Sequence, residues 1–145
     1  MGKPAKVAKF GGVCVSRPDM YDRIAKLLQE DSTRRFLVVS AIAGVTDSLF
    51  TTIAKPREEK EIDLYVAELR RKHLSLLPKS RSGHDGAVEA IEALCTKLSR
   101  LLYGISYTEE TTSRIRDFAL SFGERLSAQV VSANLRDRGI DAAPF

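Results

Sequence analysis

Two short apolar runs near the N-terminus predict β-strands. The first extends from Val7 to Phe10 and ends at Gly11-Gly12, and the second is Phe36-Leu37-Val38-Val39. Between them, Ser16 to about Gln29 has apolar residues at helical spacing, with a serine cap and an early proline at its start. Strand, helix and strand predict a parallel βαβ unit. Because the second run is continuous rather than alternating, we expect its strand to be buried on both faces.

The middle of the chain is helical by its periodicity. Apolar residues recur at helical spacing from Glu58 to Leu77, from Ala87 to Leu102, and in a third stretch that opens at Thr108. Gly139 is a suitable C-cap for the third stretch, and Gly123 leaves open a break into two helices. The final residues, 140–145, predict the start of another strand.

This inventory predicts only part of a domain. Two strands do not make a self-sufficient sheet, so residues 1–145 are expected to form the first part of a larger α/β domain. The predicted fold is an incomplete three-layer αβα sandwich with a largely parallel sheet and a helix-rich middle.

Composition excludes some functions. The net charge of +4 comes from 23 basic and 19 acidic residues, and the dense basic cluster Arg70-Arg71-Lys72-His73 follows an acidic helix start. We therefore expect no nucleic-acid binding. Apolar runs fall short of the roughly 18 residues that span a membrane, and the N-terminus lacks the apolar region of a signal peptide. The expected location is the cytoplasm, without membrane attachment.

Cysteine and histidine do not suggest a metal site. Cys14 and Cys95 are expected to be reduced and buried, because two cysteines cannot build a disulfide framework. His73 and His84 lie in or beside polar segments, so they are expected at the solvated surface. Their spacing with the cysteines offers no four-ligand zinc site.

The stretch KFGGVCV, residues 9–15, carries the first candidate chemistry. Glycines after a strand allow a sharp turn and the close approach of a ligand to the main chain. The N–H groups of Gly11 and Gly12 would then face phosphate oxygens, and Lys9 would neutralise developing charge. A bare tight turn remains the alternative, because a glycine pair alone is a weak signal.

Two later stretches add polar groups. VVSAIAGVTD, residues 38–47, offers the hydroxyls of Ser40 and Thr46 at the carboxyl end of a strand, where open α/β sheets bind ligands. SFGERLSA, residues 121–128, places Glu124 at or near a helix N-terminus after a glycine. The alternative for Glu124 is a helix-start carboxylate favoured by the helix dipole.

Taken together and in this order, the three stretches resemble the aspartokinases of the amino-acid kinase family. That family has KFGGTSV, a VVSA-x-AGVT-type segment and an S-x-GERLS helix start, and the likeness extends from Lys9 to about Gly139. The resemblance implies transfer of the ATP γ-phosphoryl group to the side-chain carboxylate of L-aspartate, giving 4-phospho-L-aspartate. This reaction is the first step toward lysine, threonine and methionine.

The resemblance also implies residue roles and cofactors. Lys9 would stabilise the transferring phosphoryl group as the catalytic residue, and Gly11 and Gly12 would bind phosphate. Ser40 would form a hydrogen bond at the substrate or phosphoryl end. The aspartate itself would be held by Thr46 and Glu124, with Glu124 pairing the α-ammonium group. ATP would bring Mg²⁺, and no dedicated protein metal site is expected.

Two departures leave alternatives open. The family's Thr-Ser after the glycines is Val13-Cys14 here, which removes a hydroxyl and replaces another with a poor hydrogen-bond donor. The family's nucleotide-binding half and its regulatory ACT domains are not within these 145 residues, so the chain alone is expected to be inactive unless a second copy, in a homo-oligomer, completes it. The alternatives are a pseudokinase or interaction module, or another amino-acid kinase acting on glutamate, acetylglutamate or a nucleotide.

Overall fold

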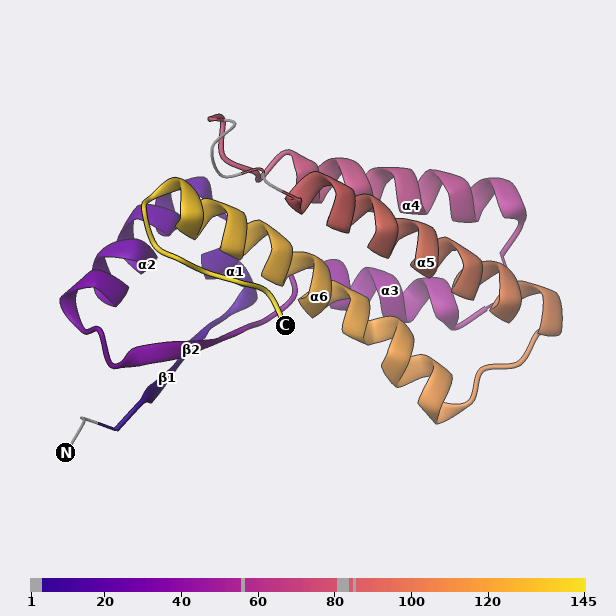
Figure 1. The fold of residues 1–145 in the computed structure, drawn as a ribbon. Coiled ribbons are helices and arrows are strands. Elements are labelled where there is room, and N and C mark those ends of the chain that lie inside the picture. The colour runs from indigo at the N-terminus through magenta and orange to yellow at the C-terminus, as the bar shows by residue number, and fades with distance from the viewer. Residues whose placement is uncertain (1–3, 56, 81–83, 85) are drawn as a thin grey trace.

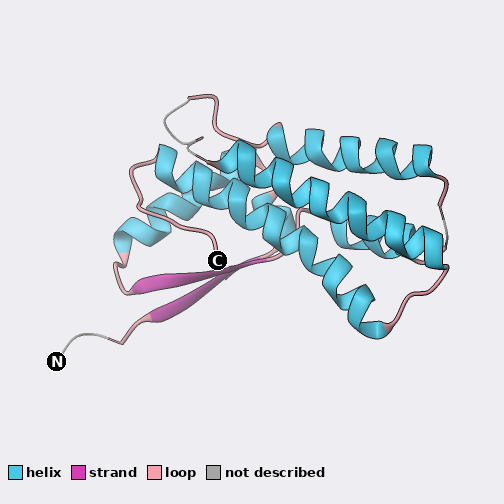
Figure 2. Ribbon diagram, turned by 45° about the vertical axis from the view of Figure 1, so that its right-hand side comes forward, coloured by secondary structure: helices cyan, strands magenta, loops and turns pink. Residues whose placement is uncertain are grey.

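The fold is a small parallel sheet with a layer of helices on one side (Figures 1 and 2). It was obtained as a computed structural model that describes residues 4–55, 57–80, 84 and 86–145, with the backbone alone for residues 34 and 35. The elements in chain order are β1 (Lys6–Phe10), α1 (Gly12–Val15), α2 (Pro18–Glu30), β2 (Arg34–Val39), α3 (Val45–Ile53), α4 (Glu59–Leu74), α5 (Ala87–Thr108) and α6 (Ser113–Asp137).

The predicted βαβ unit is confirmed. β1 and β2 pair in parallel, with Val7 opposite Phe36 and Phe10 opposite Val39. Two short helices follow the two strands, α1 immediately after Gly11 and α3 after residues 40–44. The sequence pattern did not predict either of them, because a four-residue helix and a nine-residue helix leave little periodicity to detect.

The expectation that the second strand is buried on both faces is wrong. Val7, Phe36 and Val38 are 67%, 55% and 48% exposed, respectively. They share one face of the sheet, whereas Leu37 and Val39 turn the other way and pack against the core. The helices lie on that second side alone (Figure 2), so none of the helices in the described part of the chain covers the first face.

The helix boundaries correct several predictions from the sequence. α2 begins at Pro18 with Arg17 as its N-cap, so Ser16 does not cap it. α5 runs through Gly104 to Thr108, and α6 starts after Thr112, whose hydroxyl accepts a hydrogen bond from the Ile115 N–H at 3.2 Å. Thr108 therefore ends one helix rather than opening the next.

The C-terminal residues do not form the expected strand. Gly139 is a C-cap with φ +76°, as predicted, and the Ile140 N–H bonds to the Leu135 carbonyl at 3.0 Å. Residues 140–145 then return toward the sheet in an irregular conformation, and the Arg136 guanidinium donates to the Ala142 carbonyl at 2.9 Å. A strand would need a neighbouring strand to pair with, and this segment is hydrogen-bonded to a side chain instead.

The prediction for His73 is also wrong. Its side chain is fully buried, and its Nδ1 lies 2.7 Å from the Leu69 carbonyl oxygen. Burial lowers the pKa of His73, because a charged imidazolium is poorly solvated there. His73 follows Leu69 by four residues and Ile62 by eleven, which places all three on the inner face of α4. His84 is half-buried beside the Pro78 carbonyl rather than fully solvated.

The cysteines behave largely as expected. Both are free thiols. Cys95 is buried in the core, and burial raises its pKa to about 11, so it is a protonated packing residue at neutral pH. Cys14 is only half-buried.

Candidate functional site

The carboxyl ends of the two strands are joined directly. The Ser40 N–H donates to the Phe10 carbonyl at 3.1 Å, which continues the parallel pairing one residue beyond β2. Because Lys9 precedes Phe10 and Gly11 follows it, three predicted site residues meet at this edge of the sheet. In open α/β sheets, ligands bind outside the carboxyl ends of the strands.

Lys9 lies on the uncovered face of the sheet. Its register partner is Val38, and its side chain is exposed. Paired residues of parallel strands point to the same side, so the Lys9 ammonium group stands beside the exposed face, one residue before the edge.

Gly11 and Gly12 do not form the expected sharp turn. Gly11 has φ −75° and ψ 165°, a conformation open to any residue, and its carbonyl accepts the first bonds of α1 from Cys14 and Val15 at 3.0 and 3.2 Å. Gly12 is the first residue of α1. A Cβ at Gly12 would lie 2.5 Å from the Ala41 carbonyl oxygen, whereas a Cβ at Gly11 would meet nothing within 4 Å. Gly12 is therefore required for close packing of α1 on residues 40–44.

Residues 40–44, which we call the strand-end loop, turn the chain from β2 into α3. The Val45 N–H bonds to the Ile42 carbonyl at 2.9 Å, and Gly44 has φ +80°. Ile42 is buried and anchors the loop, whereas Thr46, the second residue of α3, is exposed. Ser40 at the start of the loop and Thr46 just after it thus lie on either side of a buried anchor.

Glu124 lies in the middle of α6, not at a helix N-terminus, so the predicted position and its explanation by the helix dipole are both wrong. Gly123 does not break the helix. A Cβ at Gly123 would lie 2.7 Å from the Cβ of Ala41, so α6 packs as closely on the strand-end loop as α1 does. Glu124 is exposed directly beside this contact.

A cavity of about 820 Å³ adjoins this site. It lies between α6, β2 and residues 140–145, and most of its lining is apolar, including Phe36, Val131 and Leu135. Glu124 lines it, whereas the other predicted site residues do not. A small charged substrate needs converging polar groups, which lie at the sheet edge. We therefore take the edge, and not the cavity, as the candidate site.

Two residues that the sequence analysis did not select hold the strand-end loop. Ser16 Oγ accepts a hydrogen bond from the Ala43 N–H at 2.9 Å and donates to the Gly12 carbonyl. Lys72 Nζ donates to the Ala43 carbonyl at 2.9 Å. The pattern around Ser16 indicated a helix cap, and Lys72 belonged to a basic cluster interpreted as solvated, so the sequence held no signal for either contact.

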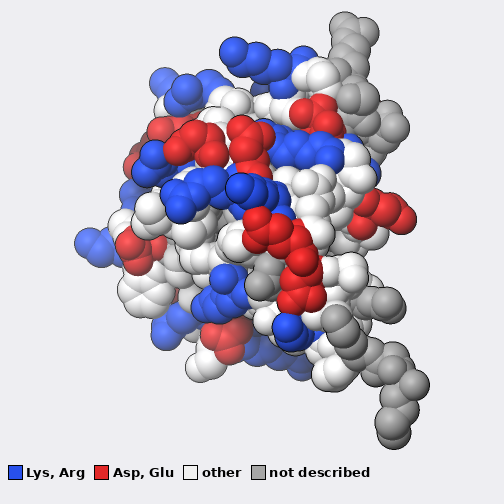
Figure 3. All heavy atoms as spheres, turned by 90° about the vertical axis from the view of Figure 1, so that its left-hand side faces the viewer, with Lys and Arg blue, Asp and Glu red and all other residues white. Residues whose placement is uncertain are grey.

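The described residues form no group of three or more potential metal ligands. In the same part of the chain, each helix is too short or too polar to cross a membrane. On the face drawn in Figure 3, basic and acidic side chains are intermixed, as on a solvated surface.

The chain belongs to the amino acid kinase family, whose model matches residues 4–145. Aspartokinase 2, chloroplastic, of Arabidopsis thaliana is 32% identical over 145 residues, which is 96% of this chain and 26% of that protein. Bifunctional aspartokinase/homoserine dehydrogenase 2, chloroplastic, of Zea mays is 28% identical over 137 residues, or 92% of this chain and 15% of that protein. The chain thus spans about a quarter or less of these relatives.

A solved structure supports the same conclusion about the fold. Escherichia coli aspartokinase III in complex with aspartate and ADP superimposes with a TM-score of 0.78 at 28% identity, over 92% of this chain and 29% of that chain. Its complex with lysine and aspartate gives a TM-score of 0.79. The resemblance to aspartokinases and the incomplete amino-acid kinase fold are confirmed.

Proposed function

We propose that this chain forms the aspartate-binding part of an aspartokinase domain. Such a domain transfers the γ-phosphoryl group of ATP to the side-chain carboxylate of L-aspartate. The observation that carries the proposal is the convergence on one sheet edge. Ser40 bonds to Phe10, and both Gly12 and Gly123 pack against Ala41, which brings the segments that carry the six predicted site residues together around the strand-end loop.

At the phosphoryl side, Lys9 and the two glycines would act. The Lys9 ammonium group would offset the negative charge of the transferring phosphoryl group, and the N–H groups of Gly11 and Gly12 would donate to its oxygens. Ser40, bonded to the end of β1, would donate its hydroxyl at the junction of phosphoryl group and substrate. The attacking aspartate carboxylate is ionised at neutral pH, so the chain needs no general base.

At the substrate side, Glu124 would pair with the α-ammonium group of aspartate, and Thr46 would donate to a substrate carboxylate. Glu124 is exposed in the middle of a long, well-packed helix, so its backbone is held in a fixed position while its carboxylate stays accessible. This pairing selects an amino acid over a simple dicarboxylate, because the latter has no cation to offer.

ATP with Mg²⁺ would supply the phosphoryl group when bound. Mg²⁺ is usually held by substrate phosphates, water and one or two carboxylates, so it would be bound together with the nucleotide. We further propose that the nucleotide is bound mainly by a half of the domain outside these 145 residues. The lysine and threonine pathways, the cytoplasm and assembly with a second copy remain predictions, and the plant relatives above are named chloroplastic.

One observation favours a second candidate, a pseudokinase. Val13 is 68% exposed on α1, and Cys14 is half-buried next to it. The exposed isopropyl group of Val13, at the predicted phosphate side, cannot donate a hydrogen bond. The loss of this donor is the kind of change expected in a chain that binds aspartate without turnover.

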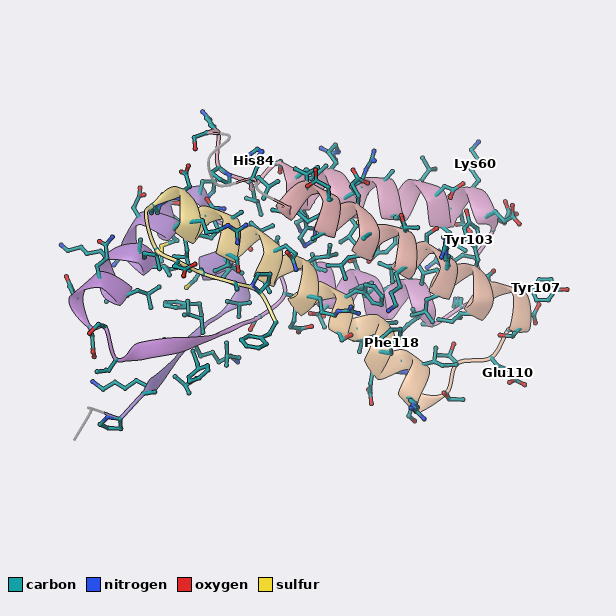
Figure 4. All side chains as sticks on the ribbon, viewed as in Figure 1. Lys60, His84, Tyr103, Tyr107, Glu110 and Phe118 are labelled. Atoms are coloured by element: carbon teal, nitrogen blue, oxygen red, sulfur yellow. The ribbon has the colours of Figure 1, made fainter. Side chains whose placement is uncertain are left out.

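Calorimetric titration of the chain with L-aspartate tests the proposal. We expect binding that Glu124→Gln weakens by about 10- to 100-fold, because it removes one charged hydrogen bond. Glu110→Gln is the matched control, since Glu110 is an exposed carboxylate at the far end of the helical layer (Figure 4). Equal affinity for L-glutamate would favour another amino-acid kinase, and no aspartate binding would contradict the proposal. With ATP, Mg²⁺ and hydroxylamine, the chain alone should trap no aspartyl hydroxamate.

A further inference from the structure

Ala43 is held at both of its backbone polar groups by side chains from distant parts of the chain. Its N–H donates to Ser16, 27 residues earlier, and its carbonyl accepts from Lys72, 29 residues later. Ser16 also donates to the Gly12 carbonyl, so the same hydroxyl connects α1 to the strand-end loop. The two partners come from different elements, the α1–α2 junction and the last turn of α4.

The position of Ala43 makes these contacts significant. It is three residues after Ser40 and three residues before Thr46, the two hydroxyl residues that the proposed function places on the substrate. The next residue, Gly44, has φ +80°, and the left-handed region gives glycine wide freedom. The side chain of Ala43 is exposed, so it does not itself anchor the loop. The side-chain hydrogen bonds to its backbone therefore add to the restraint that buried Ile42 places on this half of the loop.

We propose that Ser16 and Lys72 are positioning residues that together fix Ala43, and through it the spacing of Ser40 and Thr46. The link to substrate rests on the proposed function, whereas the restraint on Ala43 does not. Fixed supporting groups matter because small displacements of contact residues lower binding and rate steeply. Lys72 would thereby link the end of α4 to the substrate side of the site.

The restraint on Ala43 is tested first without ligand. Amide hydrogen exchange of the whole chain is measured by NMR. Ser16→Ala removes the acceptor of the Ala43 N–H, and we expect about tenfold faster exchange at that amide. Lys72→Met should accelerate exchange there by a smaller factor. Ser16→Thr and Lys72→Arg keep the donor and acceptor groups and should restore protection. Arg71→Met, an exposed basic neighbour on the same turn, is the control.

The positioning role is tested by measuring the affinity of each variant for L-aspartate. The comparison uses variants whose melting temperature equals that of the wild-type chain. Ser16→Ala and Lys72→Met should each weaken binding about three- to tenfold, with recovery in the Thr and Arg variants, a pattern that a loss of global stability would not produce. The double variant should deviate from additivity, because both residues hold the same peptide segment.

The outcomes separate this inference from the proposed function. Exchange at Ala43 equal to wild type in both Ser16→Ala and Lys72→Met would overturn the restraint. Faster exchange with unchanged aspartate affinity would overturn the positioning role. Absence of aspartate binding by the wild-type chain would refute the proposed function, and the positioning role with it, while the exchange rates would still decide whether Ser16 and Lys72 restrain Ala43.

Discussion

At the sheet edge, the backbones of two helices pack closely on the strand-end loop, whereas at the far end of the helical layer, long side chains pack on side chains. Gly12 and Gly123 bring α1 and α6 so close to Ala41 that neither position has room for a Cβ. Toward the far end, the Arg116 guanidinium lies 5.9 Å from the Phe50 ring centre, and Lys97 Nζ lies 5.8 Å from that of Phe118. Both rings are about half exposed.

The difference shows where the molecule requires a single geometry. Long side chains at the far end can adjust to a substitution, because exposed charge–ring contacts are worth little. Figure 4 shows Tyr107 and Glu110 extending away from that end. The Ala41 contacts cannot adjust without moving the strand-end loop, which carries Ser40 and leads into α3 with Thr46.

The largest expected effect breaks the contact between α1 and the loop. Gly12→Ala places a Cβ 2.5 Å from the Ala41 carbonyl oxygen and should lower the free energy of unfolding by about 3 kcal/mol. Gly11→Ala is the control, because a Cβ there meets nothing within 4 Å and the backbone suits alanine. Urea unfolding measures both. Equal stability of the two variants would contradict the close-packing role of Gly12.

A second pair of glycines compares the two ends of the helical layer. Gly123→Ala should cost about 1 kcal/mol, since crowding against the Ala41 Cβ outweighs the gain in helix propensity. Gly104→Ala, in the interior of α5 with open space around it, should stabilise the protein by about 1 kcal/mol. If both variants stabilise the protein in the same urea unfolding experiment, the inferred close packing of α6 on the strand-end loop is wrong.

The smallest expected effect concerns pH and the buried His73. Because burial lowers the pKa of His73 in the folded state, the unfolded chain binds more protons as the pH falls below the ordinary histidine value of about 6.5. Stability should therefore decrease between about pH 7 and pH 5. His73→Gln should flatten this dependence in urea unfolding measured across that range, whereas His84→Gln should leave it in place. If the free energy of unfolding of His73→Gln depends on pH as strongly as that of the wild type, His73 is not the cause of the dependence.

Periodicity predicted most of the fold. The two strands and the helices α2, α4, α5 and α6 follow apolar spacing, which depends on neighbours along the chain. His73 was misassigned although the signal was present, because its polar neighbours obscured its spacing from Ile62 and Leu69. The exposure of Phe36 and Val38 was not predictable, since it depends on which layers cover the sheet.

From the sequence, the candidate site could be predicted only as a list of residues, whose roles stay predictions, and not as an arrangement in space. The resemblance selected Lys9, Ser40 and Glu124, and the structure places their segments around one edge. The need for glycine at position 12 could not be inferred from the sequence, because it arises from close contact with the Ala41 carbonyl, 29 residues later. The contacts of Ser16 and Lys72 with Ala43 are equally long-range.

The most direct test of the central claim is an NMR titration of the chain with L-aspartate, following the backbone amide shifts. Binding at the sheet edge should shift amides in residues 9–12, 40–46 and 123–125 together, with one dissociation constant. Shifts centred on residues 140–145 and the apolar cavity, or no shifts at saturating aspartate, would contradict an aspartate site at this edge.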